Sequence, residues 1–218
     1  MTQENKDIID TSGMSEEKAA ALDIAEMARD QTWSGRTFAK DIFMGKLDFS
    51  NIYPFPEQPE DDKKAGEEFL NKFNTVLRDT VDPNEIDKTG EIPDEAFKAI
   101  ADIKGFAIKI PTKYGGLGLS QTNYLRAGQL MGSHCASTAA LVSAHQSIGV
   151  PQPLLMFGTE AQKEKFLPRF GEGAISAFAL TEQNVGSDPA KLETTAELSE
   201  DGKHYIIDGE KLWCTNKP

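Results

Sequence analysis

The stretch from residue 177 to 188, Ala-Phe-Ala-Leu-Thr-Glu-Gln-Asn-Val-Gly-Ser-Asp, places side-chain hydroxyls in a loop directly after an apolar run. The run Ile175–Leu180 is typical of a β-strand, and the polar residues after it are typical of a loop. The loop offers the hydroxyls of Thr181 and Ser187 and the backbone N–H groups around Gly186, which could bind a polar ligand. A strand followed by an ordinary structural turn is the alternative, because glycine–serine turns are common.

Histidines and cysteines are the other residue types that could do chemistry. His134, His145 and His204 are scattered, with neither the spacing of metal ligands nor an evident nucleophile beside them. We therefore interpret all three as structural or surface residues. Cys135 and Cys214 are the only cysteines, too few for a disulfide framework or a cysteine metal site, which indicates reduced thiols in a cytoplasmic protein. We predict no metal site.

The elements that must position the loop are predicted to be helices before it and β-hairpins after it. Apolar spacing and capping residues predict helices over 15–29, 60–82, 93–105, from Ser120 onward and over 135–148, and a capping box of Thr159 and Gln162 opens another. Strands are predicted over 194–198 and 204–208, joined around Asp201-Gly202, and a further strand around Trp213. The fold class is therefore α+β. We divide the chain into an N-terminal extension (1–55), a helical domain (56–174) and the beginning of a β domain (175–218).

Composition narrows the class of protein. With 23 basic and 35 acidic residues among 218, the formal charge is −12, which disfavours binding to nucleic acid. No apolar run approaches the roughly 20 residues of a membrane helix. The acidic residues 1–10 do not resemble an export signal. We expect a cytoplasmic location and leave peripheral membrane association open. The glycine cluster 114–119 lacks the lysine and the strand-to-helix register of a phosphate loop.

Two motifs resemble the flavin-binding signatures of the acyl-CoA dehydrogenases. Leu180-Thr181-Glu182 followed by Gly-Ser-Asp is similar to the first, and Trp213-Cys-Thr-Asn216 is similar to the second. The glycine cluster resembles the family's Tyr-Gly-Gly-x-Gly turn, which lets the chain reverse between two helices. Residues 114–168 resemble the very-long-chain branch of that family, including the segments His-Gln-Ser-Ile-Gly and Phe-Gly-Thr-x-Ala-Gln-Lys-Glu-Lys-x-Leu-Pro. Residues 38–55 look like the same branch. Gln183, where the family very often has proline, and Lys217-Pro218, where a glycine usually follows, depart from the pattern.

The resemblance implies FAD-dependent α,β-dehydrogenation of a fatty acyl-CoA in fatty acid β-oxidation. Phe178, Leu180 and Thr181 would then lie along the flavin ring, Trp213 would pack on it and Thr215 would hydrogen-bond near N5. Ser187 would contact the CoA portion and the flavin phosphate region, with Gly186 allowing close approach. The implied cofactor-binding residues are Phe178, Leu180, Thr181, Gly186, Ser187, Trp213, Cys214 and Thr215.

Substrate length, partners and the catalytic base are also matters of resemblance. Ala139 and Ser143 share one helix face, and their small side chains suggest a deep pocket for long acyl chains. The family implies electron-transferring flavoprotein as the acceptor and a homo-oligomer when full length. Its glutamate base lies in a C-terminal helical domain that this chain lacks, so we assign no catalytic residue and expect little activity from the chain alone. An acyl-CoA oxidase and a non-catalytic assembly scaffold of the same fold are the alternatives.

Overall fold

The computed structural model describes residues 57–216 together with residues 13, 15–16, 38–43, 45 and 47–55. It divides the chain into two units, residues 1–57 and residues 58–218. The first contains α2 (Phe38–Phe43) and a short 3-10 helix (Phe49–Asn51). Most of the helix predicted over 15–29 lies outside the described residues. All candidate site residues belong to the second unit.

The second unit opens with α3 (Glu60–Thr80), the longest helix of the described chain. Three acidic residues occupy its first turn, where they interact favourably with the helix dipole. Phe69, Phe73 and Leu77 recur at intervals of four residues and are buried along one face. This apolar stripe makes α3 one wall of the core, and α3 packs against α5 and α6.

Further helices follow in the order α4 (Pro83–Thr89), α5 (Asp94–Asp102), α6 (Gln121–His134), α7 (Ala136–Ser143), α8 (Pro151–Phe157) and α9 (Glu160–Gly171). The predicted caps are confirmed, because Ser120 accepts a hydrogen bond at the start of α6 and Thr159 forms the reciprocal capping box with Gln162. Neither α4 nor α8 was predicted from the sequence. Each begins with a proline at the first helical position, a recognised start signal.

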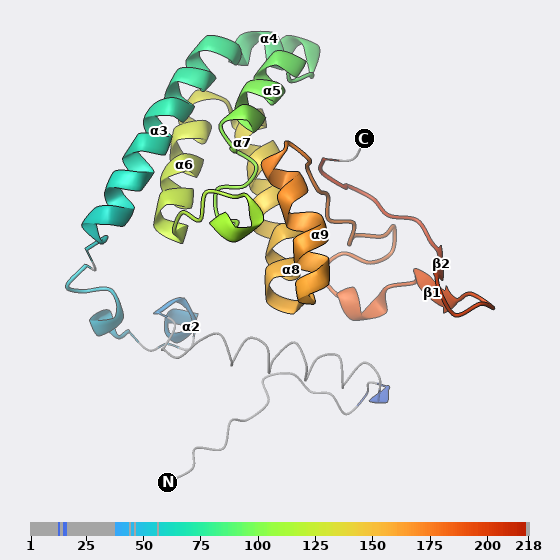
Figure 1. Cartoon of the computed structure of the whole chain (residues 1–218). Coiled ribbons are helices and arrows are strands. Elements are labelled where there is room, and N and C mark those ends of the chain that lie inside the picture. The colour runs from blue at the N-terminus through green and yellow to red at the C-terminus, as the bar shows by residue number, and fades with distance from the viewer. Residues whose placement is uncertain are drawn as a thin grey trace. The chain divides into compact units, whose positions relative to one another are not determined.

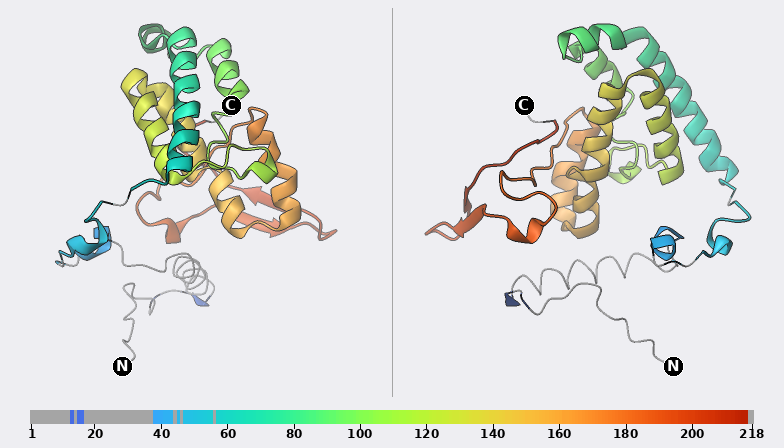
Figure 2. Two further views of the ribbon diagram at one scale, coloured as in Figure 1. Left: turned by 60° about the vertical axis from the view of Figure 1, so that its left-hand side comes forward. Right: turned by 180° about the vertical axis from the view of Figure 1, so that it is seen from behind.

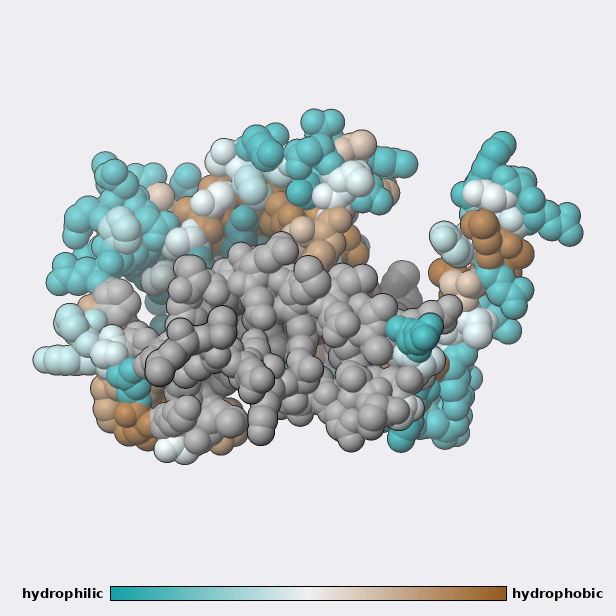
Figure 3. All heavy atoms as spheres, turned by 90° about the horizontal axis from the view of Figure 1, so that it is seen from below, coloured by the Kyte–Doolittle hydropathy of each residue, from teal (hydrophilic) through white to brown (hydrophobic). Residues whose placement is uncertain are grey.

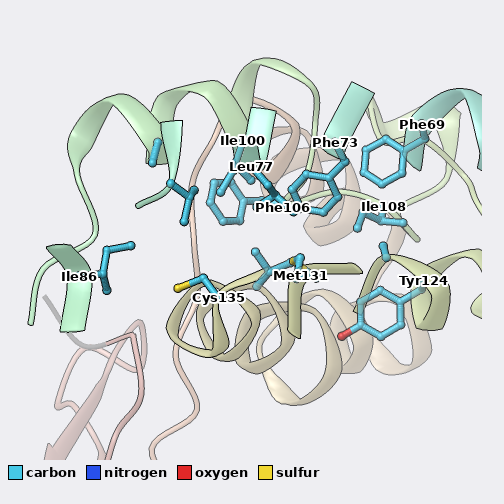
Figure 4. Packing of buried hydrophobic residues seen from close by; sticks show 14 residues of the cluster. Phe69, Phe73, Leu77, Ile86, Ile100, Phe106, Ile108, Tyr124, Met131 and Cys135 are labelled. Carbon is cyan, nitrogen blue, oxygen red and sulfur yellow. The ribbon is translucent and has the colours of Figure 1, made fainter. Parts of the chain in front are cut away.

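The core lies between α3, α5, α6 and α7, and Figure 4 shows its larger side chains converging from these helices. Phe73, Leu77, Ile100, Phe106 and Met131 are all fully buried there. Burial of such side chains contributes roughly 1.5–3 kcal/mol each. The core therefore makes the helical region a stable platform for whatever follows it in the chain.

The glycine cluster after α5 reverses the chain, as predicted. Gly115 (φ 83°) and Gly118 (φ 62°) both adopt the left-handed conformation that side chains disfavour. The reversed segment then runs back beside residues 107–110, with the Leu119 N–H donating to the carbonyl of Ile108 over 2.9 Å. The turn thus delivers the chain from α5 to the start of α6.

A π-helical turn (Ala144–Ile148) extends α7 and fastens the segment between α5 and the glycine turn. The buried Gln146 side chain accepts from Ile108 N–H over 3.0 Å and donates to the Gly105 carbonyl over 2.8 Å. Neighbouring His145 also bonds this segment, through the carbonyl of Phe106. The predicted helix 135–148 is therefore present as α7 followed by the π-helical turn. In this wider last turn, the side chains of His145 and Gln146 reach the buried residues 105–108.

Two strands, β1 (Thr195–Leu198) and β2 (Tyr205–Asp208), form an antiparallel hairpin after the helices. Gly202 (φ 67°) stands in the turn between them, at the predicted Asp-Gly position. In Figure 1 and the right view of Figure 2 the hairpin projects away from the helices. The predicted fold class is confirmed: a helical domain is followed by the beginning of a β region.

The strands predicted at Ile175–Leu180 and around Trp213 are wrong for this structure, because neither segment forms a strand in the described chain. A strand needs a neighbouring backbone along its length. Here the Ser176 carbonyl accepts from the Asn216 side chain, and only one backbone hydrogen bond joins the two segments. The apolar segment therefore lacks the ladder of backbone hydrogen bonds that defines a strand.

None of the helices within the described residues combines the length and apolar character needed to cross a membrane. Figure 3 views the chain from below and shows hydrophobic residues (brown) exposed among hydrophilic ones (teal). Several of the exposed apolar side chains belong to the hairpin, namely Leu198, Tyr205, Ile206 and Ile207. A two-stranded hairpin with both faces exposed gains little from burial and is marginal by itself.

Candidate functional site

The two motifs that could bind a ligand lie side by side, although they are far apart in the sequence. The N–H of Leu212 donates to the carbonyl of Thr181 over 2.8 Å. The ammonium group of Lys211 donates to the carbonyl of Leu180 over 3.2 Å. The two motifs are therefore joined by direct hydrogen bonds between residues 180–181 and residues 211–212.

Aromatic side chains from both segments are exposed at this site. Trp213 is 86% exposed and Phe178 is 46% exposed, while Leu180 and Thr181 are half-buried. Trp213 has φ 57°, a backbone angle that residues other than glycine seldom adopt. Exposed aromatic side chains on two segments that are hydrogen-bonded to each other could bind a flat aromatic ligand.

Polar groups flank these aromatic side chains. Thr215 is exposed, and no hydrogen bond from its hydroxyl or from that of Thr181 to another described residue is present. Cys214 is a half-buried free thiol whose sulfur lies 3.8 Å from the Leu212 carbonyl. The two threonine hydroxyls are therefore available to a ligand with a polar edge.

Gly186 and Ser187 stand in the exposed loop beyond this junction. A Cβ added at Gly186 would meet no atom within 4 Å, so the surrounding protein does not require glycine there. A close-fitting ligand is a reason for glycine that this open space accommodates. The hydrogen bonds that join the two segments involve residues 180–182 and 211–212, and they do not extend to Gly186 or Ser187.

Glu182 is a site residue that the sequence reading left without a role. Its carboxylate is buried and accepts from Lys211 Nζ over 2.7 Å, from the N–H of Glu193 over 2.6 Å and from the N–H and hydroxyl of Thr194. The Lys211 hydrogen bond, followed by that from Thr194, lowers the pKa of Glu182 to about 2. Glu182 stands among the polar residues of the loop, between Thr181 and Gln183, so no local signal distinguished it.

Asn216 anchors the end of the second motif. Its side-chain amide donates to the carbonyl of Leu141 over 3.0 Å and to the carbonyl of Ser176 over 3.3 Å. Leu141 belongs to α7 and Ser176 precedes Phe178. The second motif is thus fastened both to the helical region and to the first motif.

His145 binds Ser176, which Asn216 also contacts, and the imidazole ring of His145 is neutral. Its Nδ1 accepts from the N–H of Ser176 over 3.0 Å, so the proton resides on Nε2, which donates to the Phe106 carbonyl over 2.8 Å. Burial lowers the pKa of His145. The structural interpretation of this histidine is confirmed. His134 contacts the Val81 carbonyl, and His204 is exposed.

Ala139 and Ser143 both lie on α7, as the shared face required. Ala139 packs partly against the core, and the Ser143 hydroxyl donates to the Ala140 carbonyl over 3.3 Å. Both side chains are half-buried. The Asn216 bond to Leu141 brings the second motif to the same helix, close in sequence to these two residues.

An apolar hollow of about 740 Å³ lies between α8, α9 and residues 174–178. Phe157, Phe166, Phe170 and Phe178 are among the residues that line it. Phe178 therefore borders the hollow and lies two residues before Leu180, whose carbonyl accepts from Lys211. In the part of the chain that the structure describes, no cluster of acidic, histidine and cysteine side chains could hold a metal ion.

Two protein-family sequence models match the chain. The one described as "Acyl-CoA dehydrogenase, N-terminal domain" matches residues 63–174, and the one described as "Acyl-CoA dehydrogenase, middle domain" matches residues 177–218. The second match includes both candidate motifs, and the first includes α7.

Two curated proteins illustrate the similarity. The probable acyl-CoA dehydrogenase FadE10 of Mycobacterium tuberculosis is 46% identical over 203 residues, which are 93% of this chain and 31% of that protein. The mitochondrial very long-chain specific acyl-CoA dehydrogenase of Mus musculus is 34% identical over 183 residues, 83% of this chain and 28% of that protein. The chain thus spans about a third of the length of these relatives.

Solved structures resemble the fold as well. Butyryl-CoA dehydrogenase from Megasphaera elsdenii matches with a TM-score of 0.65 and 30% identity, over 74% of this chain and 42% of that one. An acyl-CoA dehydrogenase complexed with FAD from Bacillus anthracis matches with a TM-score of 0.62 and 29% identity, over 73% and 27%. A chain from a structure described as the electron transferring flavoprotein of Acidaminococcus fermentans gives 0.65 and 29%, over 73% and 41%.

Proposed function

The chain belongs to the acyl-CoA dehydrogenase family, and from this we propose that it supplies part of the flavin and acyl-CoA sites of an enzyme that oxidises fatty acyl-CoA to trans-2-enoyl-CoA. The observation that carries the proposal is the junction of the two motifs. The Leu212–Thr181 hydrogen bond joins the segment that carries the exposed Trp213 to the segment that carries the exposed Phe178, and each segment also carries a threonine hydroxyl. The activity proposed is that of the longer protein to which the relatives correspond.

FAD fits the residues present at this junction. Its flavin ring is flat and aromatic, with polar atoms along one edge, and the junction offers Trp213 and Phe178 for the face and the hydroxyls of Thr181 and Thr215 for the edge. Leu180 adds apolar surface, and Cys214 lies between the two residues proposed to contact the ring. When bound, FAD supplies the acceptor for the hydride that leaves the β carbon, which no side chain can supply.

The residues of this chain bind and orient rather than transfer protons. The Thr181 and Thr215 hydroxyls would hold the polar edge of bound FAD by hydrogen bonds that favour an electron-rich ring. Trp213 covers apolar surface and excludes water. In the exposed loop, the Ser187 hydroxyl binds the CoA portion and Gly186 permits the close approach of phosphate to backbone N–H groups. Glu182 is not a candidate base, because its carboxylate is engaged by four donor groups.

We further propose that the substrates have long acyl chains. The relatives with very-long-chain names and the small side chains at Ala139 and Ser143 support this. In the full-length protein, Ala139→Phe is expected to lower kcat/KM for palmitoyl-CoA by at least about tenfold relative to butyryl-CoA, because a ring at this position shortens the pocket. Ala140→Phe, at the adjacent exposed position of α7, is the control and should change both substrates equally. Equal loss with Ala139→Phe would refute the assignment of this helix to the pocket.

Electron-transferring flavoprotein is the proposed electron acceptor, and a homo-oligomer is the proposed assembly. The structural similarity to a chain from an electron transferring flavoprotein structure supports a link to that class of partner. An oxidase would instead pass electrons to oxygen. A non-catalytic scaffold would keep the fold and lose the reaction.

One experiment separates these functions. The full-length protein is purified, its visible spectrum is recorded, and palmitoyl-CoA is added without oxygen. Bleaching of the flavin band supports acyl-CoA oxidation. Admission of oxygen then separates the two enzymes, since rapid return of the band indicates an oxidase. A flavin band that no acyl-CoA bleaches would favour the scaffold, and a colourless protein that FAD cannot reconstitute would overturn the proposed cofactor site.

A further inference from the structure

We propose that the ion pair of Glu182 and Lys211 is a positioning device that fixes the two flavin-binding segments against each other. The proposal rests on the proposed function, because it assigns a role to residues that do not themselves contact the cofactor. It concerns the register of residues 180–182 against residues 211–213.

Burial distinguishes this ion pair from the others. The Glu182 side chain is 4% exposed and that of Lys211 is 22% exposed. Among the ion pairs within the described residues, the rest have at least one partner more than half exposed. Surface pairs of that kind contribute little, because water screens them, whereas a desolvated pair with further hydrogen bonds resists separation.

Lys211 holds the first segment at two points. Its Nζ lies 2.7 Å from the Glu182 carboxylate and 3.2 Å from the Leu180 carbonyl. These two acceptors flank Thr181, whose carbonyl accepts the single backbone hydrogen bond between the segments, from Leu212. The ammonium group of Lys211 therefore binds the first segment on both sides of the Leu212–Thr181 hydrogen bond.

Glu182 in turn holds the connection between the two segments. Its carboxylate accepts from the backbone N–H groups of Glu193 and Thr194 and from the Thr194 hydroxyl. Residues 193–194 lead directly into β1, which begins at Thr195. One carboxylate thus joins the first motif, the entry to the hairpin and, through Lys211, the second motif.

Loss of the cation is expected to release this arrangement. Without Lys211, a buried carboxylate keeps only neutral donors and is drawn toward water. Its movement would loosen residues 193–194 and leave one backbone hydrogen bond to set the register. Trp213 is two residues from Lys211, so its position relative to Phe178 would change. Positional errors of about 1 Å are enough to weaken a preorganised site severely.

The test measures FAD binding by the full-length protein. Flavin is removed, FAD is titrated back, and its fluorescence and visible spectrum are followed for the wild type and for Lys211→Met, Lys211→Arg and Lys191→Met. Lys191 pairs with Asp188 in the same loop, but that pair is exposed (76% and 56%), which makes Lys191→Met the matched control. Far-UV circular dichroism and thermal unfolding check that the helices of each variant are intact.

Lys211→Met is expected to raise the Kd for FAD at least about tenfold, the scale of one lost charged hydrogen bond. At saturating FAD its flavin band should also differ from that of the wild type, which simple destabilisation would not cause. Lys211→Arg, which keeps the cation, should recover most of the affinity, and Lys191→Met should leave it unchanged. A folded Lys211→Met protein with wild-type Kd and spectrum would overturn the proposal.

Two other outcomes are also decisive. A wild-type protein that binds no FAD would overturn the proposed function rather than the role of the ion pair alone. Should Lys211→Met fail to fold, Thr194→Val removes one neutral donor to Glu182 and leaves the ion pair in place. It should raise the Kd for FAD at least about threefold, the effect of one neutral hydrogen bond, and an unchanged Kd in that variant would refute the positioning role.

Discussion

Gln146 offers a quantitative test of how the π-helical turn holds the loop before the glycine cluster. The perturbation is Gln146→Met, which keeps the length of the side chain and removes both polar groups. In the native structure the Ile108 N–H and the Gly105 carbonyl each bond Gln146, and both residues are buried. The substitution therefore leaves one donor and one acceptor without partners, away from water.

The magnitude follows from these two groups. Each unsatisfied buried polar group costs about 1–3 kcal/mol, so the loss of unfolding free energy from the two groups should be about 2–6 kcal/mol. Urea unfolding followed by far-UV circular dichroism measures it, because the helices dominate that signal. The matched control is Gln129→Met, an exposed position on α6, for which a change within about 0.5 kcal/mol is expected. A loss below about 1 kcal/mol for Gln146→Met would show that the loop finds other partners, and would refute the account.

Two further predictions concern the glycines and acid stability. At Gly116 an added Cβ would clash with the backbone carbonyl of Ile110, so Gly116→Ala should lower the free energy of unfolding by about 1–3 kcal/mol in urea. Gly128 lies in a helix with open space around it, so Gly128→Ala should raise the free energy of unfolding by up to about 1 kcal/mol. Equal effects of the two substitutions would contradict the packing argument. The hydrogen bond from Tyr114, followed by that from Lys163, lowers the pKa of Glu160 from 4.5 to about 2. Because the folded pKa is the lower one, this stabilisation is complete above about pH 4.5 and is lost as the pH falls toward 2. Glu160→Gln should therefore lose less stability than the wild type over that interval, and parallel pH profiles would argue against the contact.

Much of the helical region could be predicted, because its signals are local. The spacing of Phe69, Phe73 and Leu77 and the capping box of Thr159 with Gln162 depend on residues within one turn of helix. The hairpin around Gly202 was predictable for the same reason. Helix α4 was missed although Asp82-Pro83 carried its start signal, since a seven-residue helix shows little periodicity.

The strands expected at 175–180 and around Trp213 could not be judged locally. An apolar run shows that a segment is suited to a sheet, but strand formation depends on a neighbouring backbone that another part of the chain must provide. In this structure side chains take that place: Asn216 bonds the Ser176 carbonyl, and Lys211 bonds the Leu180 carbonyl.

The sequence by itself determined most of the helices of residues 58–171, the hairpin, the family and the residues proposed to contact a flavin, because periodicity, caps and motifs depend on residues close together in the sequence. The tertiary structure alone decided that Glu182 pairs with Lys211, that His145 is a neutral link between Ser176 and Phe106, and that Trp213 is exposed. These contacts join segments that lie far apart along the chain. Their formation depends on how the helices and loops pack, and no local pattern encodes which distant donor a buried acceptor will meet.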